Sequence, residues 1–239
     1  MQKIASKDNE RIKFLRKLNH KKYREKFGRF FVENLKIIKD SKVTPEAVFA
    51  TDKNILEKIK SKEHFLIDAK INKSFSNLDA PSGIIAIYKK EEKNIDFSKK
   101  IVYLNAINDP GNLGTILRTA FAFGIKNIVI DEMCADVYNF KTIQAAKDSI
   151  FKLNIAQDTD KKLLKEIKKK MPIIGTRLTD GKSPEKFKNK KACFVLGSEA
   201  HGISKEIEKV SDDFLKLKMS GHIESLNVAI SAGIIFYSI

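Results

Sequence analysis

Three short blocks of this chain combine glycines with polar side chains that a hydrophobic core does not need. Along the sequence they are NDPGNLGTILRTA at 108–120, LGSEAHGI at 196–203 and MSGHIESLNVA at 219–229. Glycine lets a ligand approach the backbone closely. The amide, carboxylate, hydroxyl and guanidinium groups beside these glycines can bind and orient a polar substrate. The three blocks are therefore candidate binding loops.

The first block also has a plain structural interpretation. Asp109-Pro110-Gly111-Asn112 is a turn that opens a helix, and Arg118 can be a surface residue of that helix. The block lacks the glycine patterns of dinucleotide-binding and nucleotide-phosphate-binding loops. A helix N-terminus beside a guanidinium nevertheless suits an anion such as a phosphate group.

The second block places Glu199 between two glycines, directly after an apolar run. A glutamate at this position has no role in a core, so it is either a functional residue or simply a solvated loop residue. His201 is interpreted as a tolerated loop residue rather than as a base or a metal ligand.

The third block opens an apolar C-terminal helix. Ser225 is a candidate N-cap of this helix, which places Asn227 in the first helical turn among apolar neighbours. A buried asparagine needs hydrogen-bonding partners, which indicates a polar cluster. His222 and Glu224 belong either to this cluster or to an ordinary loop.

The elements that must position these blocks alternate between strands and helices. From residue 101 onward, strands are expected at 101–105, 127–130, 173–175, 194–197 and 214–219, and helices at 113–123, 141–151, 160–170 and 225–237. This alternation predicts a mostly parallel sheet covered on both faces. Such sheets bind ligands at the carboxyl ends of their strands. Each block follows or ends a predicted strand, so the three loops should converge.

The N-terminal part predicts a smaller α/β unit. A helix is expected over 7–26, with Ile12, Leu15 and Leu18 on its buried stripe. Strands are expected at 30–32, 47–50, 65–67 and 83–88, and helices at 35–39 and 55–60. The segment that follows is polar and charged, as linkers are. We therefore predict an N-terminal domain at 1–90, a linker at 91–100 and a second domain at 101–239.

The charge of the chain indicates a polyanionic partner. The formal net charge is +16, and residues 1–29 carry eleven Lys or Arg against three acids, so that half of the excess lies in this segment. Nucleic acid is favoured over a membrane surface, although a merely solubilising lysine-rich surface is the alternative. The candidate RNA contacts are the basic residues of the first predicted helix: Lys13, Arg16, Lys17, Lys21, Lys22 and Arg24.

Cysteine usage and hydropathy indicate a reducing compartment. Cys134 and Cys193 are too few for a disulfide framework and lack the spacing of metal ligands, so no metal site is predicted. Cys193 lies in an apolar run and is expected to be buried. No apolar run has the length of a membrane span or the form of a secretion signal. A cytoplasmic protein without membrane contact is expected.

Taken in order, the three blocks resemble the signature motifs of the SpoU-type (TrmH-like, SPOUT class) RNA ribose 2′-O-methyltransferases. The resemblance covers residues 101–239. It extends more weakly to the accessory substrate-binding domain of many members through Ile4-Ala5-Ser6, Lys17-Leu18, Arg24, Phe30-Phe31-Val32-Glu33 and Ser82-Gly83-Ile84-Ile85-Ala86. Three positions depart from the pattern: Lys218 stands where proline is common, and Ala200 and Asn34 stand where glycine is usual. The first two touch the expected cofactor pocket and could lower its affinity.

The resemblance implies an α/β fold whose C-terminal segment is threaded into a trefoil knot, a homodimer, and methyl transfer from S-adenosylmethionine to a ribose 2′-hydroxyl of RNA. Ribosomal RNA is favoured and transfer RNA is the alternative. Carried over by motif, the reaction centre comprises Asn112, Arg118, Glu199, Ser225 and Asn227. The cofactor would lie against Leu196, Gly197, Leu217, Met219 and Leu226.

The resemblance also implies roles within the reaction centre. Arg118 carries a permanently charged guanidinium, which suits a substrate phosphate better than a proton. The phosphate or Glu199 would then take the proton of the 2′-hydroxyl. Two alternatives stay open: a non-catalytic RNA-binding or ribosome-assembly protein on the same scaffold, and an enzyme of the same superfamily that methylates a base.

Overall fold

The computed structural model describes residues 1–91, 93–220 and 225–239. The chain forms two compact units. The first comprises Met1–Glu91 and Tyr138–Ile143, and the second comprises Glu92–Val137 and Gln144–Ile239. Both units combine helices with one sheet.

The sheet of the second unit has six strands in the order β11-β9-β10-β6-β7-β8, and every neighbouring pair is parallel. All residues of three adjacent strands, β10, β6 and β7, are buried, as expected for a sheet covered on both faces. The prediction of a mostly parallel sheet is confirmed. The strand bounds are β6 (Ile101–Leu104), β7 (Asn127–Asp131), β8 (Asn154–Asp158), β9 (Ile173–Thr176), β10 (Cys193–Leu196) and β11 (Asp213–Leu215).

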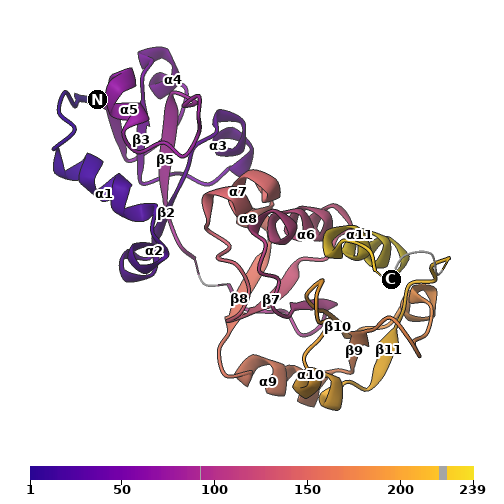
Figure 1. Cartoon of the computed structure of the whole chain (residues 1–239). Helices are drawn as coiled ribbons and strands as arrows, with labels where there is room; N and C mark the ends of the chain where they lie inside the picture. The colour runs from indigo at the N-terminus through magenta and orange to yellow at the C-terminus, as the bar shows by residue number, and fades with distance from the viewer. Residues whose placement is uncertain (92, 221–224) are drawn as a thin grey trace. The chain divides into compact units, whose positions relative to one another are not determined.

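Helices cover both faces of this sheet. Figure 1 shows α6 and α11 on one side, packed against each other, and α9 and α10 on the other. No helix of the described residues is long and apolar enough to cross a membrane. The bounds are α6 (Pro110–Ala122), α7 (Phe140–Ala146), α8 (Ser149–Lys152), α9 (Lys162–Lys170), the 3₁₀ helix η1 (Pro184–Phe187), α10 (Lys205–Val210) and α11 (Val228–Ser238).

Two predicted elements of the second unit differ from the structure. The single helix expected at 141–151 is two helices, because Lys147 adopts a left-handed conformation with φ 57° and the Ser149 hydroxyl bonds to the Ala146 carbonyl. The strand expected at 214–219 ends at Leu215, because the backbone beyond it pairs with Lys182 instead of extending along β9.

The first unit has a five-stranded sheet in the order β1-β4-β3-β5-β2. β4 pairs parallel with β1 and β3, whereas β5 pairs antiparallel with β3 and β2. The expected small α/β unit is confirmed. Its elements are β1 (Gln2–Lys3), α1 (Glu10–Leu18), α2 (Lys21–Phe27), β2 (Arg29–Val32), α3 (Leu35–Ser41), β3 (Ala47–Ala50), α4 (Lys53–Glu57), β4 (Glu63–Leu66), α5 (Ala69–Lys73) and β5 (Ile84–Lys89).

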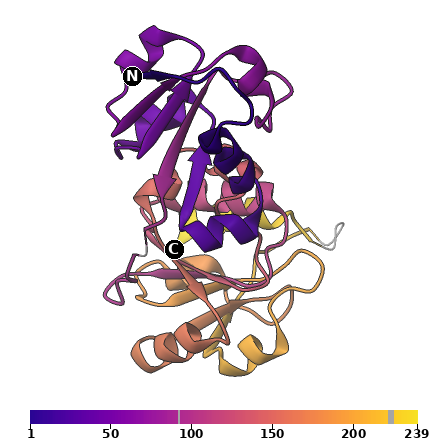
Figure 2. The ribbon, with the colours of Figure 1, turned by 90° about the vertical axis from the view of Figure 1, so that its left-hand side faces the viewer.

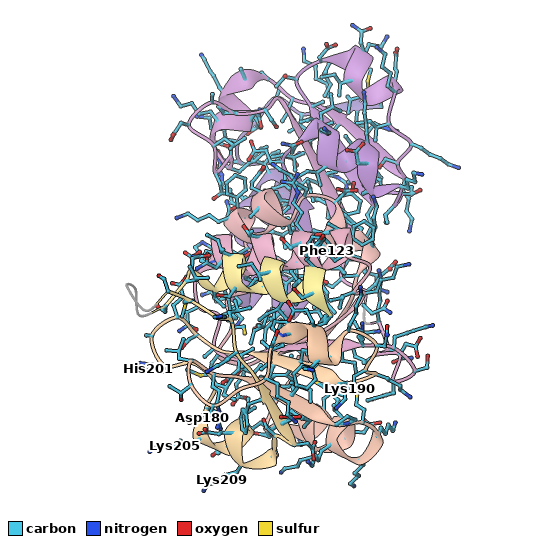
Figure 3. The ribbon with its side chains drawn as sticks, turned by 90° about the vertical axis from the view of Figure 1, so that its right-hand side faces the viewer. Phe123, Asp180, Lys190, His201, Lys205 and Lys209 are labelled. Carbon is cyan, nitrogen blue, oxygen red and sulfur yellow. The ribbon has the colours of Figure 1, made fainter. Side chains whose placement is uncertain are left out.

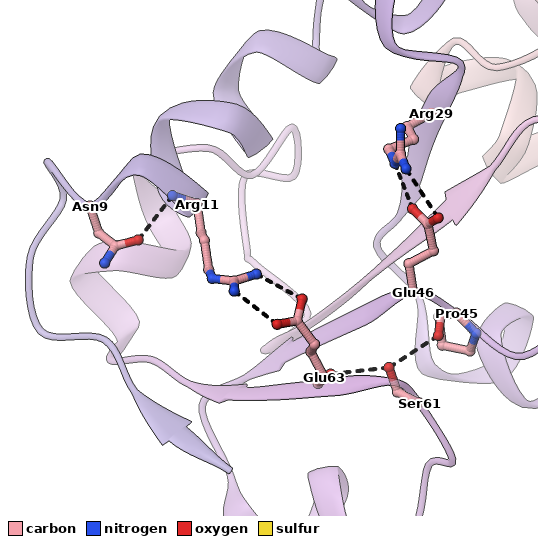
Figure 4. A network of polar contacts seen from close by, with 7 residues as sticks. All are labelled: Asn9, Arg11, Arg29, Pro45, Glu46, Ser61 and Glu63. Atoms are coloured by element: carbon pink, nitrogen blue, oxygen red, sulfur yellow. Dashed lines mark hydrogen bonds and ion pairs between the residues drawn. The ribbon is translucent and has the colours of Figure 1, made fainter.

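Helix α1 lies on one face of this sheet. Ile12, Leu15 and Leu18 are at most 1% exposed and share a core with side chains of β3, β4 and β5. At the rim of the same face, Arg11 binds both carboxylate oxygens of Glu63, at 2.7 and 2.8 Å (Figure 4). This bidentate pair fixes the start of α1 to the start of β4.

The single helix predicted over 7–26 is wrong. The chain forms α1 and α2, drawn in indigo in Figure 2, with a break at Asn19 and His20. The Arg24 guanidinium donates hydrogen bonds to the carbonyl oxygens of Leu18 (2.7 Å) and Asn19 (2.8 Å). A continuous helix would use these carbonyls for its own ladder. The arginine replaces those bonds and stabilises the turn.

Candidate active site

The three blocks meet at one carboxylate oxygen. Glu199 Oε1 accepts hydrogen bonds from Asn112 Nδ2 (3.2 Å), Asn227 Nδ2 (2.6 Å) and the Val228 amide (3.0 Å). Asn227 Nδ2 also lies 3.0 Å from Asn112 Oδ1. The expected convergence of the three loops is confirmed. Glu199 Oε2 has no hydrogen-bond partner among the described residues, so it can accept a bond from a substrate.

Local sequence explains the position of Asn112. Asp109 is the N-cap of α6, and its Oδ1 accepts from the Asn112 amide at 2.7 Å. Pro110 occupies the first helical turn, where its fixed φ favours the helix and its missing N–H costs nothing. The Asn112 side chain therefore projects from the first turn of α6, beyond the carboxyl end of β6.

Asn227 has a structural role as well as a place in the cluster. Its Oδ1 accepts from the amides of Ala229 (2.9 Å) and Ile230 (3.3 Å), so that Asn227 is the N-cap of α11. The expectation that Ser225 caps this helix is therefore wrong, and so is the placement of Asn227 as a buried residue of the first turn. The helix begins at Val228, and Asn227 is exposed. With its oxygen used by the cap, the Asn227 amide group points its nitrogen toward Glu199.

The loop that carries Glu199 requires its glycines. Ser198 and Gly202 exchange both of their backbone hydrogen bonds, at 3.0 and 2.9 Å, which closes the loop on itself. A Cβ at Gly197 would lie 2.0 Å from the Gly202 carbonyl carbon, and Gly202 itself has φ 66°. A side chain at either position would open the loop or strain it.

A cavity of about 400 Å³ lies next to this cluster. Its walls come from the segments that follow β9, β10 and β11 and from the start of α11. All five residues predicted to hold the cofactor line it: Leu196, Gly197, Leu217, Met219 and Leu226. Glu199 and Ser225 line it too, so the cavity and the carboxylate cluster form one site.

Sequence reasoning missed one wall of this cavity. Thr176, the last residue of β9, lines it together with Arg177 and Leu178, which follow the strand directly. The Arg177 guanidinium stacks on the Phe214 ring, 3.2 Å from its centroid, and donates to Glu208 at 2.7 Å. The sequence did contain an indication of this wall, because these residues follow a predicted parallel strand and therefore lie at the same edge of the sheet as the three blocks.

Arg118 forms no hydrogen bond with the Glu199 cluster. It is exposed on α6, does not line the cavity and forms no hydrogen bond or ion pair with a described residue. Its charge is therefore available to a ligand. Four residues of the third block, Gly221, His222, Ile223 and Glu224, lie outside the described residues.

All six basic residues predicted to contact RNA lie on α1 and α2, and all but Arg24 are at least partly exposed. Lys13, Lys17, Lys21 and Lys22 are exposed, and Arg16 is half-buried with its guanidinium 3.0 Å from the Ser74 hydroxyl. Arg24, predicted as an RNA contact together with these residues, is buried instead. It is only 5% exposed, because its guanidinium binds the carbonyls at the end of α1.

Sequence comparison matches both parts of the chain. Residues 99–237 match the SpoU rRNA Methylase family, and residues 9–86 match the MRM3-like substrate binding domain. The chain is 27% identical over 248 residues to the 23S rRNA (guanosine(2553)-2'-O)-methyltransferase RlmP of Bacillus subtilis, which covers 99% of this chain and 98% of that protein.

Solved structures with the same fold cover nearly the whole chain. A putative RNA methyltransferase of the TrmH family from Porphyromonas gingivalis is 28% identical, with a TM-score of 0.85 and coverage of 97% of both chains. The AdoMet-bound rRNA methyltransferase from Sinorhizobium meliloti is 22% identical, with a TM-score of 0.87 over 99% of this chain and 96% of that chain. The second likeness concerns the fold alone.

Proposed function

The chain belongs to the SpoU rRNA methylase family and is an S-adenosylmethionine-dependent RNA ribose 2′-O-methyltransferase, and we propose that it acts on ribosomal RNA at the Glu199 cluster. The resemblance carried by the three blocks is thereby confirmed. One observation carries the assignment of the site. Glu199 has one oxygen held by three donors and a second oxygen without a described partner, beside a cavity of about 400 Å³.

The cavity fits the cofactor. Its volume is within the range of about 300–1,000 Å³ that is usual for small-molecule sites. Leu196, Leu217 and Leu226 supply apolar contacts, and Gly197 forms part of the wall. S-adenosylmethionine carries its methyl group on a sulfonium, which makes that carbon electrophilic. The residues of this chain must therefore align the substrate hydroxyl and accept its proton.

Glu199 is the group best placed for this task. Its Oε2 can accept a hydrogen bond from the 2′-hydroxyl of the RNA, while Asn112 and Asn227 hold Oε1 and so fix the orientation of the carboxylate. Ser225, on the cavity wall, is a second polar contact for the substrate. Arg118, whose charge is not neutralised by a described residue, is assigned to a substrate phosphate.

Ribosomal RNA is the proposed substrate because the relative that matches over its full length is named as a 23S rRNA methyltransferase. The N-terminal domain, residues 1–90, is assigned to RNA binding through the exposed cations of α1 and α2. Phosphate contacts there would hold the RNA without reading its sequence.

A homodimer is part of the proposal. Four large apolar side chains on α11 and at the C-cap of α6 are exposed, with Phe123 beside α11 in Figure 3. They are Phe123 (45%), Ile230 (57%), Ile234 (43%) and Tyr237 (77%). Contiguous exposed apolar residues are typical of association surfaces. A second copy of this chain, packed isologously, would cover them.

The test maps 2′-O-methyl groups in total RNA from cells that lack this protein and are complemented with variants. The wild-type chain and Glu166→Gln, an exposed glutamate of α9, should restore one methylated ribose, and Glu199→Gln should not. Methyl groups recovered on a base would favour the base-methylating alternative. Cofactor binding without any transfer would favour a non-catalytic RNA-binding protein.

A further inference from the structure

One buried side chain connects the first two of the three loops. Asn105 follows β6 and is 5% exposed. Its Nδ2 donates to Asp131 Oδ2 at 2.5 Å, and its Oδ1 accepts from the Ser204 amide at 2.7 Å. Ser204 is the N-cap of α10, directly after the Glu199 loop. The amide of Asn105 therefore fixes the end of that loop to the end of β7.

Asp131 completes this connection. It is the last residue of β7 and is 5% exposed. Its Oδ1 accepts from the amides of Ala106 and Met133, both at 3.1 Å, while Oδ2 receives the Asn105 amide group. No described cation pairs with it. A buried carboxylate is retained when hydrogen bonds satisfy it, and here the donors come from the segments that follow β6 and β7.

The backbone that Asp131 holds is strained. Ala106 has φ 56°, a left-handed conformation that alanine rarely adopts. This residue redirects the chain from β6 into the loop that reaches Asp109 and Asn112. Strained backbone persists where surrounding contacts enforce it and is frequent beside functional sites. The Asp131 carboxylate supplies such a contact.

We propose that Asn105 and Asp131 are positioning residues that set the Asn112 loop and the Glu199 loop relative to each other. The inference rests on the proposed function. The bond between the two loops, Asn112 Nδ2 to Glu199 Oε1, is 3.2 Å and is the longest of the three that Glu199 Oε1 accepts. A small displacement of either loop breaks it and turns the carboxylate. Misplacement by about 1 Å can cost about 100-fold in rate.

Exchange of the two side chains tests the proposal. Asn105→Asp alone places two carboxylates against each other. Asp131→Asn alone leaves a donor NH2 group at position 131 facing another donor, which is either the Asn105 amide nitrogen or the Ala106 and Met133 amides. Asn105→Asp combined with Asp131→Asn restores one donor and one acceptor, keeps an acceptor for Ser204 and leaves an oxygen for Ala106 and Met133. Each single variant should lower kcat about 10- to 100-fold, with the KM for RNA and the affinity for S-adenosylhomocysteine changed less than about threefold. The double variant should recover kcat to within about threefold of wild type.

Asn127→Asp is the matched control, because Asn127 is 1% exposed at the opposite end of β7 and bonds to the Asp96 amide at 3.0 Å. It should lower Tm and leave kcat unchanged. Wild-type kcat in both single variants, or no recovery in the double variant, would overturn the proposal.

A second readout does not depend on methyl transfer. Hydrogen exchange of peptides that cover 104–113 and 197–205 should be faster in both single variants and return to the wild-type rate in the double variant. A wild-type protein that methylates no RNA would refute the proposed function, and this exchange pattern would still decide the positioning role. Unchanged exchange in the single variants would refute that role.

Discussion

At the residue scale, the site depends on a single acceptor shared by residues that are far apart in sequence. Glu199 Oε1 binds a side chain from α6, a side chain before α11 and a backbone amide. Charge-assisted hydrogen bonds of this kind are stronger than neutral ones. The orientation of the carboxylate is therefore set before a substrate arrives, and each donor can be tested separately.

Two substitutions of Asn227 distinguish its role as the N-cap of α11 from its role in positioning Glu199. Asn227→Ala removes the N-cap of α11 and the amide donor, so it should cost about 1 kcal/mol of stability and reduce both methyl transfer and cofactor affinity. Asn227→Asp keeps an oxygen for the Ala229 amide but places a second carboxylate against Glu199. Stability is measured by thermal unfolding, cofactor affinity by calorimetry with S-adenosylhomocysteine, and methyl transfer by turnover. We expect near-native Tm with lost turnover for Asn227→Asp. Wild-type turnover in either variant would contradict the assignment.

Substitution of Arg118 should impair methyl transfer to the substrate without weakening cofactor binding. Because it does not line the cavity, Arg118→Ala should leave the Kd for S-adenosylhomocysteine within about twofold while it lowers methyl transfer by a factor of about 100 or more, the scale for loss of one electrostatic contact at a reacting centre. Arg118→Lys keeps the charge but not the bidentate geometry and should retain part of the activity. Near-normal turnover of Arg118→Ala would remove it from the reaction centre.

The two thiols should be inert in the folded protein. Burial raises the pKa of Cys134 to about 12 and raises that of Cys193 as well. A raised pKa lowers the thiolate fraction, and the thiolate is the reactive form. Iodoacetamide at pH 8 should therefore label neither residue in native protein and both in urea, as measured by intact mass. Rapid native labelling of Cys193, which is 0% exposed, would contradict the buried placement.

At the scale of elements, apolar runs predicted the fully buried strands, whereas elements that depend on hydrogen bonds from polar side chains were not visible in the sequence. β3 matched its predicted range because all of Ala47–Ala50 is buried. β8 was missed because its sequence, NIAQD, has no apolar run and only its last residue is buried. The α1–α2 break was missed because Arg24 was counted as a surface charge. A charged residue that binds backbone carbonyls has no signature in periodicity.

The candidate site was likewise predictable only in part. The convergence of the three loops follows from the rule that parallel strands bind ligands at their carboxyl ends. The N-cap role of Asn227 and the wall formed by Arg177 depend on where helix α11 begins and where strand β9 ends. Such boundaries shift by one or two residues without a change in sequence pattern.

Arg24 provides a test of this element-scale interpretation. Arg24→Ala leaves the carbonyls of Leu18 and Asn19 without their donor and should cost about 1–3 kcal/mol of unfolding free energy. The neighbouring Lys22→Ala should change stability by less than about 0.5 kcal/mol, because Lys22 is exposed. Urea unfolding followed by circular dichroism measures both, since the chain has no Trp for fluorescence. Equal stability of the two variants would refute the carbonyl-binding role.

At the scale of the whole molecule, the exposed apolar residues and the basic N-terminus make separate predictions. Tyr237→Glu combined with Ile230→Asp places charges on the exposed face of α11 and should convert a dimer into a monomer by light scattering. Met133→Glu, on another side chain that is 63% exposed, is the control and should remain dimeric. A wild-type protein that is an active monomer at assay concentration would exclude the dimer.

The final prediction concerns how RNA is held. Lys21 and Lys22 are exposed at the start of α2, within the segment that carries half of the net charge. Binding of a phosphate by a lysine releases counterions, so log K falls with log salt by about 0.7 per contact for a single strand. Lys21→Ala with Lys22→Ala should therefore weaken binding and flatten this slope by up to about 1.4 units, with unchanged affinity for S-adenosylhomocysteine.

The control for the Lys21 and Lys22 double variant removes two positive charges elsewhere in the same unit. Lys58→Ala with Lys60→Ala, at two exposed positions after α4, lowers the net charge equally but lies outside the two basic helices. This variant should keep the wild-type slope, because counterion release depends on contacts and not on total charge. Equal slopes for the two double variants would mean that the lysines of α2 are only a solvated face. A flatter slope for the α2 variant alone would place the RNA backbone along that helix.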